Sequence, residues 1–408
     1  WGYNDEGELG NGANTQSPVP VFVSGLESGV VAIASGDYDT CALLSSGGVK
    51  CWGANWDGEL GNGTYSDSSI PTDVQGLTAG VSKLFAGAYH TCAKLVAGGV
   101  KCWGGNWNGQ LGDGTTNQSN VPVDVTIVTG QILEMAPGGD YTCALTELSN
   151  VQCWGYNYYG QLGNGGQWDS LSPVSVMNLN PGVLKVTSGY NHSCAVTNSG
   201  GVKCWGDDRY GQLGYGSLRN DSDPPRSSIP LEAYELNSGV TQIAAGDSHT
   251  CALKEDGTIL CWGANSRGQL GRIADGIYPT PVDVWGESDQ IFQIEAGNQH
   301  ACAITQTGRV KCWGLNSYGQ LGNSSTLQTY LPLDVAGLNR RATALALGFY
   351  HTCVLLEDGT VRCWGDNNWG QLGDGSYSSS SVPVLVSGLG STVSAISAGG
   401  HHTCALLA

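Results

Sequence analysis

The dipeptide Trp-Gly recurs along the chain at a nearly constant interval, and this period constrains the fold more than any other feature. Successive copies lie 51 residues apart, except for one gap of 57. The copies begin at Trp1, Trp52, Trp103, Trp154, Trp205, Trp262, Trp313 and Trp364. Self-similarity at one fixed period indicates tandem structural units, so the sequence predicts eight repeats of about 51 residues.

Each repeat contains four short runs rich in β-branched and aromatic residues, bounded by glycine-rich turns. The 63 glycines and the charged content of only 13% fit a turn-rich, all-β chain. A four-stranded antiparallel sheet of this size cannot bury both faces alone, so neighbouring sheets must cover it. We therefore expect one β-propeller domain over residues 1–408, with one four-stranded blade per repeat.

The two ends of the chain carry complementary halves of one hairpin. The sequence starts on the strand "WG" and stops on the strand "HTCALLA", which elsewhere follow each other within one hairpin. We expect the final strand to pair with the first and close the ring.

The stretch "GFYHTCVLLEDGTVRCWGDNNWGQLGDG", residues 348–375, and its seven cousins resemble the regulator of chromosome condensation repeat family, especially its bacterial, cysteine-containing members. The resemblance covers essentially the whole chain. Family members usually have seven blades, whereas this chain has eight units. Eight blades are favoured because each unit has a full set of strands, and seven blades with an overlapping unit are the alternative.

The cysteines occur in pairs ten positions apart around a turn, and a tight antiparallel hairpin brings such a pair face to face. This predicts the disulfides Cys41–Cys51, Cys92–Cys102, Cys143–Cys153, Cys194–Cys204, Cys251–Cys261, Cys302–Cys312 and Cys353–Cys363, with Cys404 left over. Reduced core cysteines and zinc ligands are the less favoured interpretations. Seven bridges indicate an oxidising compartment, either extracellular or at the cell surface.

The sequence shows no localised catalytic constellation and no cofactor motif, so we expect a protein that is not an enzyme. Six histidines lie two residues before a repeat cysteine: His90, His192, His249, His300, His351 and His402. The family resemblance implies a structural role for them, and we expect no bound metal. The glycines of "GQLG" are turn residues, because no phosphate-loop Lys-Ser/Thr follows them.

The repeats differ most in a pair of residues between the repeat Asn and the following Gly. These pairs are Trp56-Asp57, Trp107-Asn108, Tyr158-Tyr159, Arg209-Tyr210, Ser266-Arg267, Ser317-Tyr318 and Asn368-Trp369. Since the repeats superpose, the pairs should share one rim of the ring and form a binding surface rich in Trp, Tyr and Arg. The competing interpretation is that these aromatics only brace adjacent loops. A second variable set, Asp37-Tyr38, Ala88-Tyr89, Tyr190-Asn191 and Phe349-Tyr350, is expected near the mouth of the channel.

The net charge of −18 argues against nucleic acid as a partner, because phosphate backbones are bound by clustered cations. No apolar run is long enough to span a membrane. The chain starts at Trp1 without a signal segment, and we expect it to be part of a longer precursor.

Together these features predict a secreted or cell-surface propeller that binds a protein or glycan through the aromatic rim. The family resemblance agrees with this prediction, because the family includes a secreted bacterial inhibitor of β-lactamases that presents one face to its target. The alternative is a structural subunit of an extracellular filament, sheath or coat, which would bind copies of itself. An enzyme or a guanine-nucleotide exchange factor is less expected.

Overall fold

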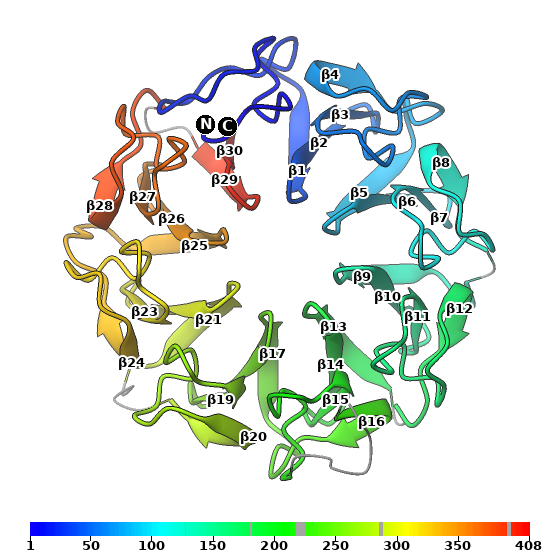
Figure 1. Ribbon diagram of the computed structural model, residues 1–408, viewed down its shortest axis with the longest axis vertical. Helices are drawn as coiled ribbons and strands as arrows, with labels where there is room; N and C mark the ends of the chain where they lie inside the picture. The colour runs from blue at the N-terminus through cyan, green and yellow to red at the C-terminus, as the bar shows by residue number, and fades with distance from the viewer. Residues whose placement is uncertain (127, 180–181, 218–224, 285–288, 390–392) are drawn as a thin grey trace.

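The computed structural model describes residues 1–126, 128–179, 182–217, 225–284, 289–389 and 393–408. Every regular element in these ranges is a β-strand, and none is a helix. The all-β prediction is therefore confirmed for the described residues. Figure 1 shows the sheets following one another around a ring in chain order, with the first strand of each sheet nearest the centre.

Seven sheets are four-stranded and antiparallel, with their strands in simple sequential order. Blade 1 consists of β1 (Val30–Ser35), β2 (Asp39–Leu44), β3 (Val49–Gly53) and β4 (Ser68–Asp73), and blade 2 of β5 (Val81–Ala86), β6 (His90–Leu95), β7 (Val100–Gly104) and β8 (Ser119–Asp124). Blade 3 consists of β9 (Ile132–Pro137), β10 (Tyr141–Thr146), β11 (Val151–Gly155) and β12 (Ser170–Ser175), and blade 4 of β13 (Val183–Ser188), β14 (His192–Thr197), β15 (Val202–Asp207) and β16 (Arg226–Glu232).

Blades 5 to 7 repeat the same arrangement. Blade 5 consists of β17 (Val240–Ala245), β18 (His249–Lys254), β19 (Ile259–Ala264) and β20 (Ile277–Asp283), and blade 6 of β21 (Ile291–Ala296), β22 (His300–Thr305), β23 (Val310–Gly314) and β24 (Thr329–Asp334). Blade 7 consists of β25 (Ala342–Leu347), β26 (His351–Leu356), β27 (Val361–Gly365) and β28 (Ser380–Leu385). A two-stranded sheet of β29 (Val393–Ala398) and β30 (Thr403–Leu407) ends the chain.

The favoured count of eight four-stranded blades is wrong, and the alternative of seven holds. In the remaining sector of the ring, which we call the closing sector, the N-terminal segment lies beside the start of β30, with an isolated bridge between Gly2 and His402, and a second bridge joins Gly2 to Ser17 within the segment. Among the described residues, Trp1 and Tyr3 hold the third-strand position of this sector by backbone hydrogen bonds to Thr403 and His401, and they form no regular strand.

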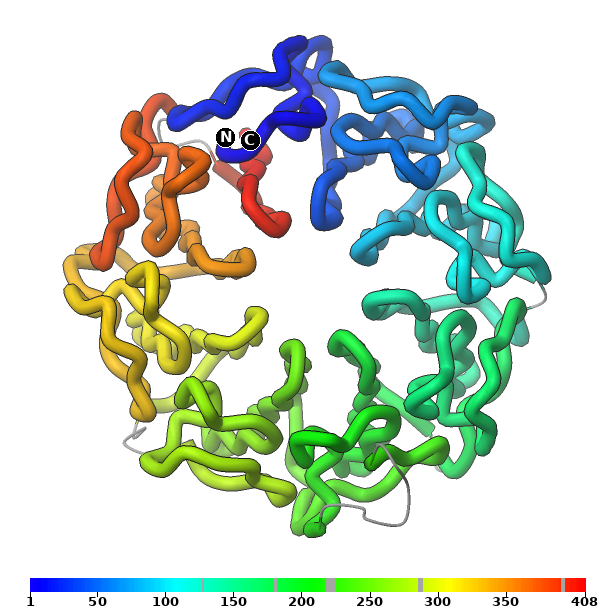
Figure 2. The backbone as a smooth tube through the Cα atoms, viewed as in Figure 1, coloured from blue at the N-terminus to red at the C-terminus, as the bar shows by residue number. Residues whose placement is uncertain are grey.

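The ends of the chain close the ring as predicted. The Trp1 amino group donates to the Thr403 carbonyl at 3.0 Å, and the Thr403 N–H donates to the Trp1 carbonyl at 2.9 Å. Figure 2 shows the first and last segments side by side. Closure therefore rests on backbone hydrogen bonds between residues about 400 positions apart.

The core lies between adjacent sheets rather than within one sheet. In the cluster between blades 1 and 2, Leu60 and the Cys41–Cys51 bridge of blade 1 pack with Trp103 of blade 2. Six further clusters fill six other interfaces in the same way. This agrees with the expectation that one sheet cannot bury both faces and depends on its neighbours.

The interface between the closing sector and blade 1 differs from the other seven. A cavity of about 320 Å³ lies there, lined by side chains that include Trp1, Phe22, Trp52 and Cys404. Its position matches the incomplete third strand of the closing sector. Cys404 has no disulfide partner among the described residues, as expected.

All seven predicted disulfides are present, and each joins strands two and three of one blade. The paired cysteines are directly opposed in the ladder, with Cα atoms 4.1 to 4.2 Å apart. The three-residue turn needs a left-handed residue at its third position, which is Gly359 in blade 7, with φ of 78°. Blade 3 has Ser149 there with φ of 57°, so serine adopts the conformation that glycine adopts more easily.

Reduction of the seven bridges should lower the melting temperature without abolishing the fold. Each bridge joins residues only 10 positions apart inside one hairpin and so removes little unfolded-state entropy, while the contacts between blades do not depend on it. Circular dichroism melts with and without a phosphine reductant measure the effect. Cys404→Ser, which leaves all seven bridges intact, serves as the control. A native protein of fully reduced mass would contradict the bridges themselves.

Candidate binding face

Two sets of loops leave the blades at the same end. In blade 1, Asp39 at the start of β2 pairs with Gly53 at the end of β3, and Ser68 at the start of β4 pairs with Gly53 as well. The loop between β1 and β2 and the loop between β3 and β4 therefore emerge on one side of the ring. We call this side the rim face, and the two loops of each sector its inner and outer loop.

A buried asparagine organises the start of the outer loop in seven of the eight sectors, and Asp208 takes its place in blade 4. Asn55 accepts a hydrogen bond from the Leu60 N–H at 3.0 Å and donates to the carbonyls of Thr64 and Ser66 at 3.0 and 2.9 Å. Asn4, Asn106 and Asn316 make equivalent contacts in other sectors. The loop is thus folded around a side chain with no exposed surface.

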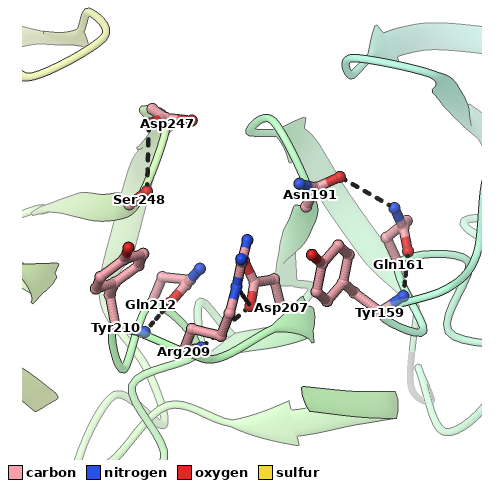
Figure 3. Close-up of polar contacts among 9 residues, drawn as sticks. All are labelled: Tyr159, Gln161, Asn191, Asp207, Arg209, Tyr210, Gln212, Asp247 and Ser248. Carbon is pink, nitrogen blue, oxygen red and sulfur yellow. Dashed lines mark hydrogen bonds and ion pairs between the residues drawn. The ribbon is translucent and has the colours of Figure 1, made fainter. Parts of the chain in front are cut away.

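A glutamine two residues beyond the rim pair couples the rim to the core. Gln212 Oε1 accepts from the Tyr210 N–H at 2.9 Å, and Gln161 Oε1 accepts from the Tyr159 N–H at 3.0 Å, as Figure 3 shows. The backbone carbonyl of the same glutamine accepts the indole N–H of the next sector, at 2.8 Å from Gln161 to Trp205. One residue therefore fixes the backbone of a rim residue and joins two sectors.

The predicted rim residues lie in the outer loops of the rim face. Seven are exposed: Trp56, Trp107, Tyr158, Arg209, Tyr210, Arg267 and Tyr318. Tyr159 and Trp369 are half-buried. Trp56 and Trp107 keep 52% and 51% of their surface accessible, which is a large exposed apolar area for residues on an ordered loop.

The rim aromatics also contact the second variable set on the inner loops. Trp56 lies 5.8 Å from Tyr38 between ring centroids, and Tyr318 lies 5.3 Å from Tyr350. These rings brace one another in tilted pairs, as the competing interpretation expects, yet Trp56 remains half exposed. Bracing and exposure therefore occur together, and the face consists of ordered aromatic surfaces.

One rim aromatic is covered by a cation of the chain itself. The Arg209 guanidinium lies 4.7 Å from the centroid of the Tyr159 ring and forms a two-point ion pair with Asp207, with Nη2 2.8 Å from Oδ2. The Asp207 carboxylate raises the pKa of Arg209, so the cation is permanent. Figure 3 shows this group between the inner loops that carry Asn191 and Asp247.

The sequence analysis missed the contribution of the closing sector to this face. Tyr3 packs edge-on against Trp369 at 5.1 Å and against Tyr38 at 6.2 Å, joining blade 7 to blade 1. Asp5 and Glu6 occupy the rim-pair position of the first repeat. They were overlooked because they are acidic rather than aromatic, although their offset from Trp1 identifies them.

Three acids interrupt the repeated framework near the closing sector. Glu8 and Glu59 stand where other repeats have glutamine, and burial raises their pKa values to about 9 and about 7. Asp39 takes the place of a repeat histidine, and its pKa is raised well above its usual value by burial and by the charge of Glu59. Burial also raises the pKa of Asp37 on the inner loop to about 6.

The repeat histidines bond between sectors. In five cases Nε2 lies 2.7 to 3.1 Å from a threonine hydroxyl of the next sector. The Thr352 hydroxyl donates to the Gln320 carbonyl, so it accepts from His300. Burial lowers the histidine pKa values to about 3 or 4. His249 differs, because Ala301 occupies the threonine position and neither ring nitrogen has a hydrogen-bond partner among the described residues.

The described ranges contain no group of three or more His, Cys, Asp or Glu side chains arranged to hold a metal ion. Within the same ranges there is also no helix long and apolar enough to cross a membrane.

Comparison with known families identifies the repeat. Eight consecutive ranges match the Regulator of chromosome condensation (RCC1) repeat: residues 1–43, 46–93, 97–145, 150–196, 199–253, 256–304, 307–355 and 358–406. The chain belongs to the RCC1 repeat family. Each RCC1 repeat runs from the third strand of one sector to the second strand of the next, so repeats and blades are offset.

Relatives with RCC1 repeats cover most of the chain. The Ultraviolet-B receptor UVR8 of Arabidopsis thaliana is 34% identical over 83% of this chain and 77% of the receptor. The E3 ubiquitin-protein ligase HERC2 of Homo sapiens is 31% identical over 90% of this chain, which spans only 8% of the ligase. The crystal structure of Prp20p from Saccharomyces cerevisiae has a TM-score of 0.67 at 23% identity, covering 85% of this chain and 87% of Prp20p. The last comparison supports the fold alone.

Restoring the RCC1 repeat glutamine at Glu59 should stabilise the protein more at pH 8 than at pH 5. The unfolded carboxyl loses its proton near its ordinary pKa, whereas the folded one keeps it up to about pH 7, so the wild type loses stability as pH rises between these values. Glu59→Gln should raise the melting temperature by about 2–4 °C at pH 8 and by less at pH 5. The reverse change Gln110→Glu is the control and should lower it at pH 8. Equal shifts at both pH values would contradict the assigned cause.

Completing the hydrogen bond of His249 should also stabilise the ring. Ala301→Thr places a hydroxyl where other RCC1 repeats bond the histidine and the glutamine carbonyl, and we expect about 1 kcal/mol of added stability. Denaturant unfolding measures the change. Thr352→Ala, which removes the equivalent bond from His300, should destabilise by a similar amount. A destabilised Ala301→Thr protein would show that the site has no room for the hydroxyl.

Proposed function

We propose that this chain is a non-catalytic binding module that engages a protein partner through the rim face. The observation that carries the proposal is the row of half-exposed Trp and Tyr side chains on that face. Large aromatic side chains dominate the energetics of protein interfaces, and they lose little conformational entropy on binding because they have few rotatable bonds.

The framework beneath the rim supports this role. Buried Asn and Gln side chains hold the backbone of the outer loops, so the aromatics are presented without a large ordering cost. The rim pair varies from repeat to repeat, whereas the buried Asn and Gln framework is nearly constant. This pattern is typical of a recognition surface carried on a constant scaffold.

Known relatives agree with protein binding as a class. The Prp20p structure was described together with its binding properties to Gsp1p and histones, and UVR8 is a receptor. We do not carry the ligase activity of HERC2 to this chain, because the chain spans 8% of that protein.

We further propose that the protein is secreted or displayed at the cell surface. Seven disulfides in one chain are expected in an oxidising compartment and are rare in the cytosol. A glycan is the second candidate ligand, because Trp56 and Trp107 are exposed and Trp107 lies beside the partly exposed polar side chain of Asn108, a combination that suits sugar rings. The rival function is a structural subunit that binds its own copies.

Rim variants distinguish these functions. Trp56→Ala and Trp107→Ala should each weaken binding to a partner found among secreted and surface proteins at least tenfold, measured by surface plasmon resonance. Val96→Ala, which trims an exposed side chain of a hairpin on the opposite face, is the control and should leave binding unchanged. Loss of binding in the control, or none in the rim variants, would contradict the proposal. Ordered filaments of the pure protein in negative-stain images would favour the structural function.

A further inference from the structure

Four aromatic side chains meet where the ring closes, and we call them the closure patch: Tyr3, Tyr38, Trp56 and Trp369. Tyr3 stands edge-on to Trp369, with 5.1 Å between centroids and 84° between planes. Tyr38 continues the row, 6.2 Å from Tyr3 and 5.8 Å from Trp56. The patch thus combines the closing sector with blades 7 and 1, and each of its rings retains accessible surface.

The closure patch is surrounded by carboxylates without neighbouring cations. Burial raises the pKa of both Tyr3 and Tyr38, and the charge of Glu6 adds to the rise. Asp37 acts on Tyr38 in the same direction. Neither Glu6 nor Asp37 takes part in an ion pair within the described part of the chain. The surrounding loops, residues 3–16, 36–38, 54–67, 366–379 and 399–401, contain no Lys or Arg.

Elsewhere on the rim face, an aromatic ring beside a carboxylate is in contact with a cation. Across the ring, Arg209 lies over the Tyr159 ring while its guanidinium pairs with Asp207 (Figure 3). Arg226 lies 5.1 Å from the centroid of the Tyr158 ring. In that sector the chain supplies its own cation to an aromatic ring beside a carboxylate. At the closure patch the rings and carboxylates are present, and the chain supplies no cation.

We propose that the closure patch binds a Lys or Arg side chain on an exposed segment of the partner protein. The proposal rests on the protein-binding function above and names the chemistry of the partner. The face of an aromatic ring attracts a cation through its quadrupole, and the uncompensated carboxylates Glu6 and Asp37 add a charge attraction. The charge contribution should weaken as salt rises, while the aromatic contact persists.

Fluorescence anisotropy with a labelled peptide of alternating Gly and Arg tests this assignment. The matched peptide has Gln in place of Arg, and each is measured at low and at physiological salt. We expect the Arg peptide alone to bind, and Trp56→Ala or the double variant Glu6→Gln/Asp37→Asn to weaken it about 5- to 30-fold. Melting temperatures confirm that each variant is folded.

Two control variants separate the closure patch from general effects. The double variant Asp73→Asn/Asp124→Asn also removes two negative charges, but from the outer strands, where both acids pair with lysines. It tests non-specific attraction of the peptide by the acidic chain. Tyr318→Ala removes a rim aromatic from a loop without acids and tests generic aromatic contact. Both should retain binding within about twofold.

The outcomes distinguish the proposals. Equal loss in the charge control, or equal binding of the Gln peptide, overturns the cation assignment and leaves the rim as a binding face. Self-association that disappears in Trp56→Ala, with no peptide binding, also overturns it and assigns the patch to a second copy. If the Arg peptide binds as expected while the partner of the rim face is unaffected by Trp56→Ala and Trp107→Ala, the proposed function fails instead.

Discussion

The hydrogen bond from the indole of each Trp-Gly to a backbone carbonyl of the preceding sector is the interaction on which the structure depends. It occurs eight times, from Trp1 to Gln371 and from Trp52 to Glu8 through to Trp364 and Gln320. Because the indole is buried, an unpartnered N–H would be costly, so each sector needs its neighbour in one position. The same carbonyl belongs to the residue that holds the outer loop, and the rim face is therefore fixed by the packing of the core.

The spacing of Trp-Gly and of the cysteine pairs was enough to predict strands, bridges and the location of the rim. Those features are local and repeated, so a prediction made for one repeat applies to the others. The number of complete blades was not predictable in the same way, because the closing sector depends on where residues are available for a third strand. The contact of Tyr3 with Trp369 joins positions 366 residues apart. No periodicity indicates which ends meet or which acidic pair then lies beside them.

Departures from the repeat gather near the closing sector. Glu8, Glu59 and Asp39 replace neutral framework residues, and the neighbouring interface contains the cavity in place of a filled core. Residues that lower the folding stability locally are common at functional surfaces, where stability is not the only requirement. The orphan His249 lies elsewhere in the ring, and nothing in the structure explains the alanine opposite it.

The placement of the disulfides determines how the molecule responds to mechanical tension. Every disulfide bridge among the described residues lies inside one blade, so no disulfide there links neighbouring sectors. Tension applied at Trp1 and Ala408 acts first on the hydrogen bonds of Trp1 and Tyr3 to Thr403 and His401, because no disulfide among the described residues crosses that seam. Each blade that yields later can extend only as far as its bridged hairpin allows. Such a ring unfolds blade by blade, and the stretched chain keeps seven short loops that remain closed by disulfides.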